Sequence, residues 1–145
     1  GDREEYINKA IKYLKENYKI EVVKATELIE TKPYGLEQQD KFLNNVVKIR
    51  TLLDPLELLV LCKNIEKMLG RVKTEHWGPR PIDIDILFYD DLVIDSEDLV
   101  VPHEDMKNRS FVLEPMMDIA PYLRHPVFNK TIKEMYTELL NQNSN

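Results

Sequence analysis

The sequence predicts an α+β sandwich with a mainly antiparallel sheet. Apolar residues recur at helical spacing near the start of the chain and alternate with period two across residues 82–88. Predicted strands and helices alternate without the regular repeat that a parallel βαβ sheet requires. A length of 145 residues suits a single domain around one hydrophobic core.

The first 51 residues predict one helix followed by two strands. The expected apolar face of this helix consists of Tyr6, Ile7, Ala10, Ile11, Leu14 and Tyr18. Residues 20–29 are rich in Val, Ile and Thr, which is typical of a strand, and a second strand is expected over residues 42–51. A polar loop through Asp40 joins the two strands.

A helix is expected to begin at Asp54 and to end at Gly70. Asp54 is a capping acid, Pro55 suits the first helical position, and Glu57 adds a carboxylate in the first turn. Gly70 is a typical helix stop. Cys62 lies on the apolar side of this helix, so a buried core thiol is favoured over the alternative of a nucleophile.

The second half of the chain predicts three short strands and two helices. The strands are expected over residues 82–88, 92–94 and 99–101, with a turn at Asp90 and Asp91. One helix should begin between Asn108 and Glu114 and run to about Ile119, although Pro115 is unusual inside a helix. Apolar spacing over residues 131–140 predicts a final helix.

Two aspartates on the strand predicted over residues 82–88 are candidate metal ligands. Ile82, Ile84 and Ile86 would line the buried face, which directs Asp83 and Asp85 to the other face. Their Cα atoms would lie roughly 6.5 to 7 Å apart, close enough for shared cations. The alternative is an ordinary solvated acidic face.

Basic residues just before the aspartates favour the metal interpretation. The segment contains Arg71, Lys73, His76 and Arg80, and it is punctuated by Gly70, Gly78 and Pro79. Cations that face a carboxylate pair are typical of a site in which metal holds a polyphosphate from one side and Arg or Lys from the other.

Two blocks in this order resemble a known family. Residues 77–87 read Trp-Gly-Pro-Arg-x-x-Asp-Ile-Asp-Ile-Leu, and residues 101–115 read Val-Pro-His-x-x-Met-x-x-Arg-x-Phe-Val-Leu-x-Pro. Both are similar to the 6-hydroxymethyl-7,8-dihydropterin pyrophosphokinases, which are folate-pathway enzymes, and weaker similarity extends from Gly1 to about Ile132. The resemblance implies a ferredoxin-like fold.

The resemblance also implies a nucleotide and metal site. Asp83 and Asp85 would hold two Mg²⁺ ions that bridge the ATP phosphates and the acceptor hydroxyl. The side chains implied at the phosphates or the AMP leaving group are Arg71, Arg80, His103 and Arg109, with Lys73 as a helper. Glu66 and Ile86 would lie near the nucleotide, and Trp77 would close over the site. The alternatives are solvated surface charges for the arginines and an ordinary loop histidine for His103.

The resemblance implies a pterin site formed by six further residues. They are Thr31, Pro33, Tyr34, Phe42, Asn44 and Phe111. Phe42 and Phe111 would stack on the flat heterocycle, and the amide of Asn44 would read its edge. Without the family, the two phenylalanines would be interpreted as core residues.

Composition excludes several classes of function. The net charge of −6 argues against a general nucleic-acid or anionic-membrane binder. A single cysteine forms no intrachain disulfide and favours the cytoplasm. No apolar run approaches the ~18 residues of a membrane span. Neither a Walker-type loop nor a dinucleotide fingerprint occurs, so nucleotide binding would depend on side chains and metal.

The family usually begins with a short apolar strand before the Gly-Asp-Arg found here at residue 1. That strand would lie inside the sheet, so we expect that residues precede Gly1 in the native product or that another element fills the position.

The predicted reaction is transfer of diphosphate from ATP to the hydroxymethyl group of a dihydropterin, with release of AMP and without a covalent enzyme intermediate. The substrates are small molecules, and fusion to neighbouring folate enzymes is an expected variation. The alternatives are a metal-dependent phosphoesterase or nuclease that uses Asp83 and Asp85, and a non-catalytic nucleotide-binding module.

Overall fold

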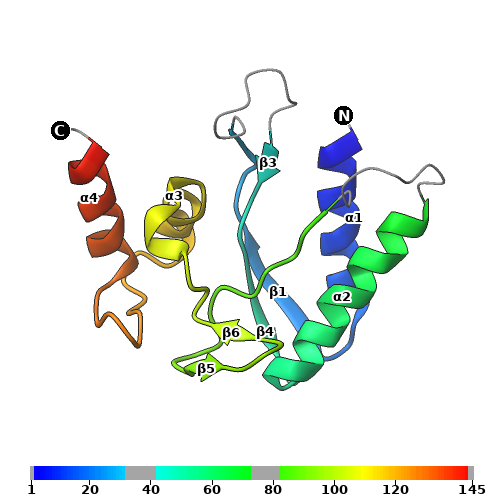
Figure 1. The fold of residues 1–145 in the computed structure, drawn as a ribbon. Coiled ribbons are helices and arrows are strands. Elements are labelled where there is room, and N and C mark those ends of the chain that lie inside the picture. The colour runs from blue at the N-terminus through cyan, green and yellow to red at the C-terminus, as the bar shows by residue number, and fades with distance from the viewer. Residues whose placement is uncertain (1, 32–41, 73–81, 144–145) are drawn as a thin grey trace. The chain divides into compact units, whose positions relative to one another are not determined.

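A computed structural model describes residues 2–31, 42–72 and 82–143 (Figure 1). Its elements in chain order are α1 (Asp2–Glu16), β1 (Ile20–Ala25), β2 (Ile29–Thr31), β3 (Phe42–Asn44), β4 (Val47–Thr51), α2 (Pro55–Val72), β5 (Ile94–Asp95), β6 (Val100–Val101), the 3₁₀ turn η1 (Met106–Asn108), α3 (Ser110–Ile119) and α4 (Ile132–Asn143). These helices and small antiparallel sheets confirm the α+β class.

The chain divides into two compact units, and each is described by itself. The first unit comprises Gly1–Val23 and Ile49–Ile86, and the second comprises Lys24–Lys48 and Leu87–Asn145. Among the described helices, none has an apolar stretch long enough to cross a lipid bilayer.

Helices α1 and α2 pack together in the first unit (Figure 1). The predicted amphipathic pattern of α1 is confirmed at Ala10 and Leu14, which are buried. Tyr18 was expected on the same face, but its side chain is 88% exposed. The helix ends at Glu16, and the Asn17 side chain then accepts the backbone N–H of Lys19 at 2.9 Å. This turn takes Tyr18 out of the helical register.

The predicted start of α2 is confirmed, and its predicted end is wrong. Asp54 Oδ1 accepts the backbone N–H of Glu57 at 2.8 Å, while Glu57 Oε1 accepts that of Asp54 at 2.9 Å. The helix continues through Gly70 to Val72. Gly70 does not have the left-handed backbone of a C-terminal cap, so it does not stop the helix.

Each of the two strands predicted before α2 is divided in the structure. Strand β1 pairs with β4, and β2 pairs with β3 in an antiparallel register. At the break, Thr26 Oγ1 accepts the backbone N–H of Val46 at 2.9 Å, and Asn45 Nδ2 donates to Thr26 O at 3.3 Å. The backbone N–H of Thr26 also donates to Val46 O at 2.9 Å, so side chains supplement one backbone hydrogen bond at the point where both strands are interrupted.

Residues 82–89 belong to no strand ladder within the described part of the chain, so the strand predicted over residues 82–88 is wrong. The backbone N–H of Ile84 donates to the Glu66 side chain instead of a neighbouring strand. The predicted alternation is nevertheless confirmed, because Asp83 and Asp85 are exposed while Ile82, Ile84 and Ile86 are partly buried.

The turn at Asp90 and Asp91 is confirmed, and Asp90 takes the left-handed backbone that aspartate tolerates, with φ of 50°. The return strand forms two residues later than the start predicted at Leu92. It is β5, which pairs with β6 so that Ile94 lies opposite Val101.

A hydrophobic core joins η1, α3 and α4 in the second unit. Its buried members are Met106, Val112, Leu113, Met116, Ile132, Met135 and Leu139. The predicted position of α3 is confirmed, with Pro115 inside it. The start of α4 is reinforced by Thr131 and Glu134, whose side chains accept each other's backbone N–H groups at 3.1 and 3.0 Å.

His125 anchors the loop before α4. Its ring is 4% exposed, stacks on Phe128 at a centroid distance of 4.2 Å, and meets Phe88 edge-on at 5.7 Å. The Nδ1 atom accepts the backbone N–H groups of Val127 and Phe128 at 3.2 and 3.1 Å. A ring nitrogen that accepts hydrogen bonds is unprotonated, and burial lowers the pKa of His125.

Candidate functional site

The candidate residues are distributed over both units. In the first unit the structure describes the side chains of Glu66, Asp83, Asp85 and Ile86, and in the second those of Asn44, His103, Arg109 and Phe111. Several predicted residues lie outside the described part, namely Pro33, Tyr34, Lys73, His76, Trp77 and Arg80. Only the backbone is described for Thr31, Phe42 and Arg71.

The segment that carries Asp83 and Asp85, residues 82–86, is called the aspartate segment. A buried carboxylate holds it against α2. Glu66 is 4% exposed, and its Oε2 atom accepts the backbone N–H of Ile84 at 2.6 Å. Its Oε1 atom lies 3.4 Å from Lys63 Nζ, one turn earlier on the helix. The hydrogen bond from Ile84 therefore fixes the backbone midway between Asp83 and Asp85.

Two predicted pterin residues are in direct contact in the second unit. Asn44 Nδ2 donates to the backbone carbonyl of Phe111 at 2.6 Å. In an unbroken helix this carbonyl would accept the N–H of residue 115, but Pro115 has none. Pro115 thus leaves the carbonyl available, and Asn44 occupies it, which links β3 to α3 and orients the amide.

The backbone of the β2–β3 ribbon places further pterin candidates beside Asn44. Thr31 lies opposite Phe42, and Ile29 lies opposite Asn44. Along the backbone of β3, Phe42 and Asn44 are two residues apart.

Arg109 lies between a ring and a carboxylate. Its guanidinium carbon is 5.6 Å from the centre of the Phe111 ring, and its Nε atom donates to Asp105 Oδ2 at 3.2 Å. Hydrogen bonds from the side chains of Asn108 and Arg109 lower the pKa of Asp105, so this carboxylate stays charged at neutral pH. The Asp105 carboxylate and the Phe111 ring together restrain the direction of the Arg109 guanidinium.

His103 is attached through its backbone to the end of the aspartate segment. Its N–H donates to the carbonyl of Leu87 at 2.9 Å, and Leu87 follows Asp85 by two residues in the sequence. The imidazole is partly buried.

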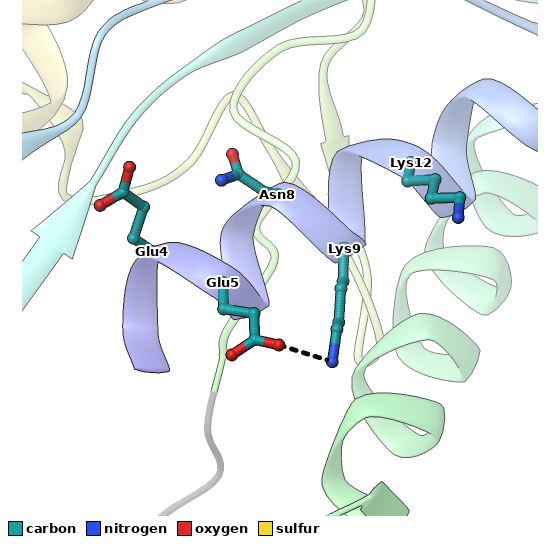
Figure 2. Close-up of a pocket in the computed structure, with 5 residues that line it drawn as sticks. All are labelled: Glu4, Glu5, Asn8, Lys9 and Lys12. Carbon is teal, nitrogen blue, oxygen red and sulfur yellow. Dashed lines mark ion pairs between the residues drawn. The ribbon is translucent and has the colours of Figure 1, made fainter. Parts of the chain in front are cut away.

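A shallow hollow of about 400 Å³ is lined by none of these residues. Figure 2 shows its lining, which comes from α1 alone: Glu4, Glu5, Asn8, Lys9 and Lys12. Lys9 and Glu5 form an ion pair of 3.2 Å in which both side chains are largely exposed. Its lining offers only a solvated helix surface for binding.

Residues 1–121 match the family model of 7,8-dihydro-6-hydroxymethylpterin-pyrophosphokinase, abbreviated HPPK. The chain belongs to the HPPK family. It is therefore an enzyme, a pyrophosphokinase, and this family uses ATP as a co-substrate.

Named relatives agree with this membership. The 2-amino-4-hydroxy-6-hydroxymethyldihydropteridine pyrophosphokinase of Aquifex aeolicus is 46% identical over 138 residues, which cover 95% of this chain and 85% of the relative. The Bacillus subtilis protein of the same name is 44% identical over 120 residues, which cover 83% of this chain and 72% of the relative.

Two longer relatives match along only part of their own length. The bifunctional protein FolKE of Lactococcus lactis is 46% identical over 119 residues, covering 82% of this chain and 34% of the relative. The folic acid synthesis protein fol1 of Schizosaccharomyces pombe is 40% identical over 142 residues, which cover 98% of this chain and 19% of the relative.

The carboxylates fit the chemistry of Mg²⁺. Asp83 and Asp85 are exposed and supply hard oxygen donors. The described residues contain no group of three or more His, Cys, Asp or Glu side chains that could enclose a metal. An exposed pair of carboxylates suits Mg²⁺, which is often held by one or two carboxylates together with substrate phosphates and water.

The interpretation of Cys62 as a core thiol is confirmed. Burial, followed by the negative charge of Glu66, raises the pKa of this thiol to about 11. The side chain is 4% exposed and stays protonated at neutral pH, so it is a poor nucleophile.

Three residues that affect the surroundings of candidate residues are not among those predicted from the sequence, namely Lys63, Asp105 and Pro115. Asp105 could have been found from its position four residues before Arg109, a spacing typical of helical ion pairs. Lys63 precedes Glu66 by three residues, which is another such spacing. The role of Pro115 depends on Asn44, which is remote in sequence, and therefore gives no local pattern.

Proposed function

We propose that this HPPK transfers the β,γ-diphosphate of ATP to the hydroxymethyl group of 6-hydroxymethyl-7,8-dihydropterin in folate biosynthesis. The products are AMP and the pterin diphosphate. The observation that carries the proposal is the family match over residues 1–121, which includes an exposed pair of aspartates on a backbone held by Glu66.

In this proposal Asp83 and Asp85 hold two Mg²⁺ ions. The ions would supply charge neutralisation and alignment of the phosphates. The chain itself contributes mainly position and electrostatics, and no residue is required to form a covalent intermediate.

Basic side chains are assigned to binding the ATP phosphates and the AMP leaving group. These are Arg71, Arg80, His103 and Arg109, with Lys73 as a helper. Arg109 supports this role because Asp105 and the Phe111 ring restrain its guanidinium. Trp77 is assigned to closing the site against water, and Ile86 to contact with the nucleotide.

The pterin is assigned to Thr31, Pro33, Tyr34, Phe42, Asn44 and Phe111. Because Asn44 Nδ2 donates to the Phe111 carbonyl, the Oδ1 atom would be the one that accepts a hydrogen bond from the ligand. We therefore assign to Asn44 the recognition of an N–H donor on the pterin edge. The rings of Phe42 and Phe111 are assigned to stacking on its faces.

The same proposal covers the fold type of the domain and its cellular location. The chain is assigned to one pterin pyrophosphokinase domain with a ferredoxin-like sandwich, working in the cytoplasm on small-molecule substrates. The partial match to longer folate-synthesis proteins supports fusion with neighbouring pathway enzymes as a variation on this domain.

The products of a single turnover test the reaction. Enzyme mixed with ATP, Mg²⁺ and the pterin alcohol is followed by phosphorus NMR, and AMP with a pterin diphosphate is expected. ADP with a monophosphorylated pterin would show attack at the γ-phosphorus and overturn the proposal. Release of phosphate or diphosphate without the pterin would instead indicate a phosphoesterase, and no turnover would indicate a binding module.

A further inference from the structure

The buried carboxylate of Glu66 occupies an unusual position for a charged group. Its side chain is 3% exposed on α2, and burying a charge is costly unless hydrogen bonds and counter-charges compensate. The compensation includes the Ile84 N–H at 2.6 Å and the Lys63 ammonium at 3.4 Å. A charge-assisted bond of this length to a backbone N–H is strong.

The bond falls where the backbone has no support from a sheet. Within the described residues, 82–86 belong to no strand ladder, so β pairing does not set the direction of their side chains. Side chains alternate along an extended segment, and Asp83 and Asp85 are exposed on either side of Ile84. Fixing the Ile84 N–H therefore restrains both aspartates together.

We infer that Glu66 is a positioning residue that sets the direction of Asp83 and Asp85 and does not itself contact the nucleotide or the metal. This inference depends on the proposed function for the purpose of the two aspartates. It differs from the role near the nucleotide that the family resemblance implied for Glu66. Its burial and the hydrogen bond that its Oε2 atom accepts from the Ile84 N–H support the distinction.

Three substitutions of Glu66 separate position from charge. Glu66→Gln keeps the shape and an oxygen for the Ile84 N–H but removes the charge. Glu66→Ala removes both, and Glu66→Asn is polar but one methylene too short to reach. A positioning role predicts that the Gln variant restores most of the wild-type behaviour, whereas a direct contact with metal or phosphate predicts that it fails like the others.

The matched control is Glu57 on the same helix. Its carboxylate also accepts a backbone N–H, that of Asp54 at 2.9 Å, but it does so at the start of α2. Glu57→Ala should lower the stability of the helix without changing the response to metal. It thus reports what a weakened α2 does by itself.

Binding is measured without turnover. The probe is Mn²⁺ titrated into the full chain with the α,β-methylene analogue of ATP, followed by water proton relaxation. We expect Glu66→Ala and Glu66→Asn to weaken Mn²⁺ binding by about tenfold or more, and Glu66→Gln and Glu57→Ala to stay within about threefold of wild type.

The Ile84 amide gives a readout that requires neither metal nor activity. In ¹H–¹⁵N NMR spectra of the apo protein, its proton should lie downfield in wild type and Glu66→Gln and move upfield in Glu66→Asn. If Glu66→Ala does not fold, Glu66→Gln against Glu66→Asn decides the same question.

Two results would overturn the inference. One is equal weakening of Mn²⁺ binding by Glu66→Gln and Glu66→Asn, which indicates a role of the charge itself. The other is metal binding within about threefold of wild type in Glu66→Asn, which indicates that the aspartates do not need the bond. Products other than AMP and pterin diphosphate would remove the proposed function while leaving the amide shift and the Mn²⁺ affinities as independent results.

Discussion

The hydrogen bond from Asn44 to the Phe111 carbonyl should be energetically coupled to Pro115. Asn44→Ala leaves a partly buried carbonyl without its donor, which costs about 1 to 3 kcal/mol of unfolding free energy. Pro115→Ala supplies a backbone N–H that can bond to the same carbonyl inside α3. When Pro115→Ala is already present, Asn44→Ala should therefore cost only about 0.5 kcal/mol.

The two substitutions form a double-mutant cycle in which other consequences of Pro115→Ala cancel. These include the lost packing of a buried ring and the gain of a better helix former. Urea unfolding followed by far-UV circular dichroism gives the four free energies. We expect a coupling of about 0.5 to 2.5 kcal/mol, most of which lies above the ~0.5 kcal/mol within which independent sites add.

Asn45 provides the control for this cycle. Its Nδ2 atom donates to Thr26 O at 3.3 Å. Asn45→Ala therefore removes a comparable side-chain hydrogen bond that does not involve α3. Asn45→Ala should be additive with Pro115→Ala. Additivity of Asn44→Ala with Pro115→Ala would refute the reasoning, because it would mean that the proline does not create the acceptor that Asn44 uses.

Three further predictions concern the aspartates, the aromatic ring and the buried histidine. Asp83→Ala or Asp85→Ala should leave the fold intact, since both side chains are exposed, while turnover in a coupled AMP assay falls by several orders of magnitude; near-normal turnover would remove the metal assignment. Phe111→Ala should weaken pterin binding by on the order of 1 to 3 kcal/mol in calorimetry and ATP binding by less, because Asp105 still restrains Arg109, and equal losses for both ligands would indicate a folding defect. Burial lowers the pKa of His125 in the folded protein, so below about pH 6.5 the unfolded chain binds more protons than the folded chain does. The free energy of unfolding should therefore be level above that pH and fall at lower pH by at most ~1.4 kcal/mol per pH unit. His125→Asn should flatten this slope in urea titrations between about pH 5 and 7, and an unchanged slope would assign it to other groups.

Local patterns in the sequence predicted the helices well because each helix carries its own signals. The capping residues Asp54 and Glu57 and the apolar spacing of α1 lie within a few residues of each other, so they are visible without knowing the fold. Signals that depend on a single residue type failed, as at Gly70, where the helix continues because its last turns keep helical backbone.

The sequence indicates candidate site residues but not the contacts that hold them. The alternation that exposes Asp83 and Asp85 was predicted correctly, although the segment is held by Glu66 and not by a strand ladder. The contact between Asn44 and Phe111 joins residues 67 positions apart. Such pairings arise from tertiary packing, which periodicity in one segment does not encode.

Pro115 shows that a residue can shape its surroundings through a group that it lacks. Any other amino acid at this position would return a donor to the helix and give the Phe111 carbonyl a second partner. A search for resistance or specificity changes that considers only residues facing the ligand would pass over it. In the proposed site, the proline would be a remote constraint on which atom of Asn44 a pterin analogue meets, and inhibitor selectivity would then shift through a position that the inhibitor never touches.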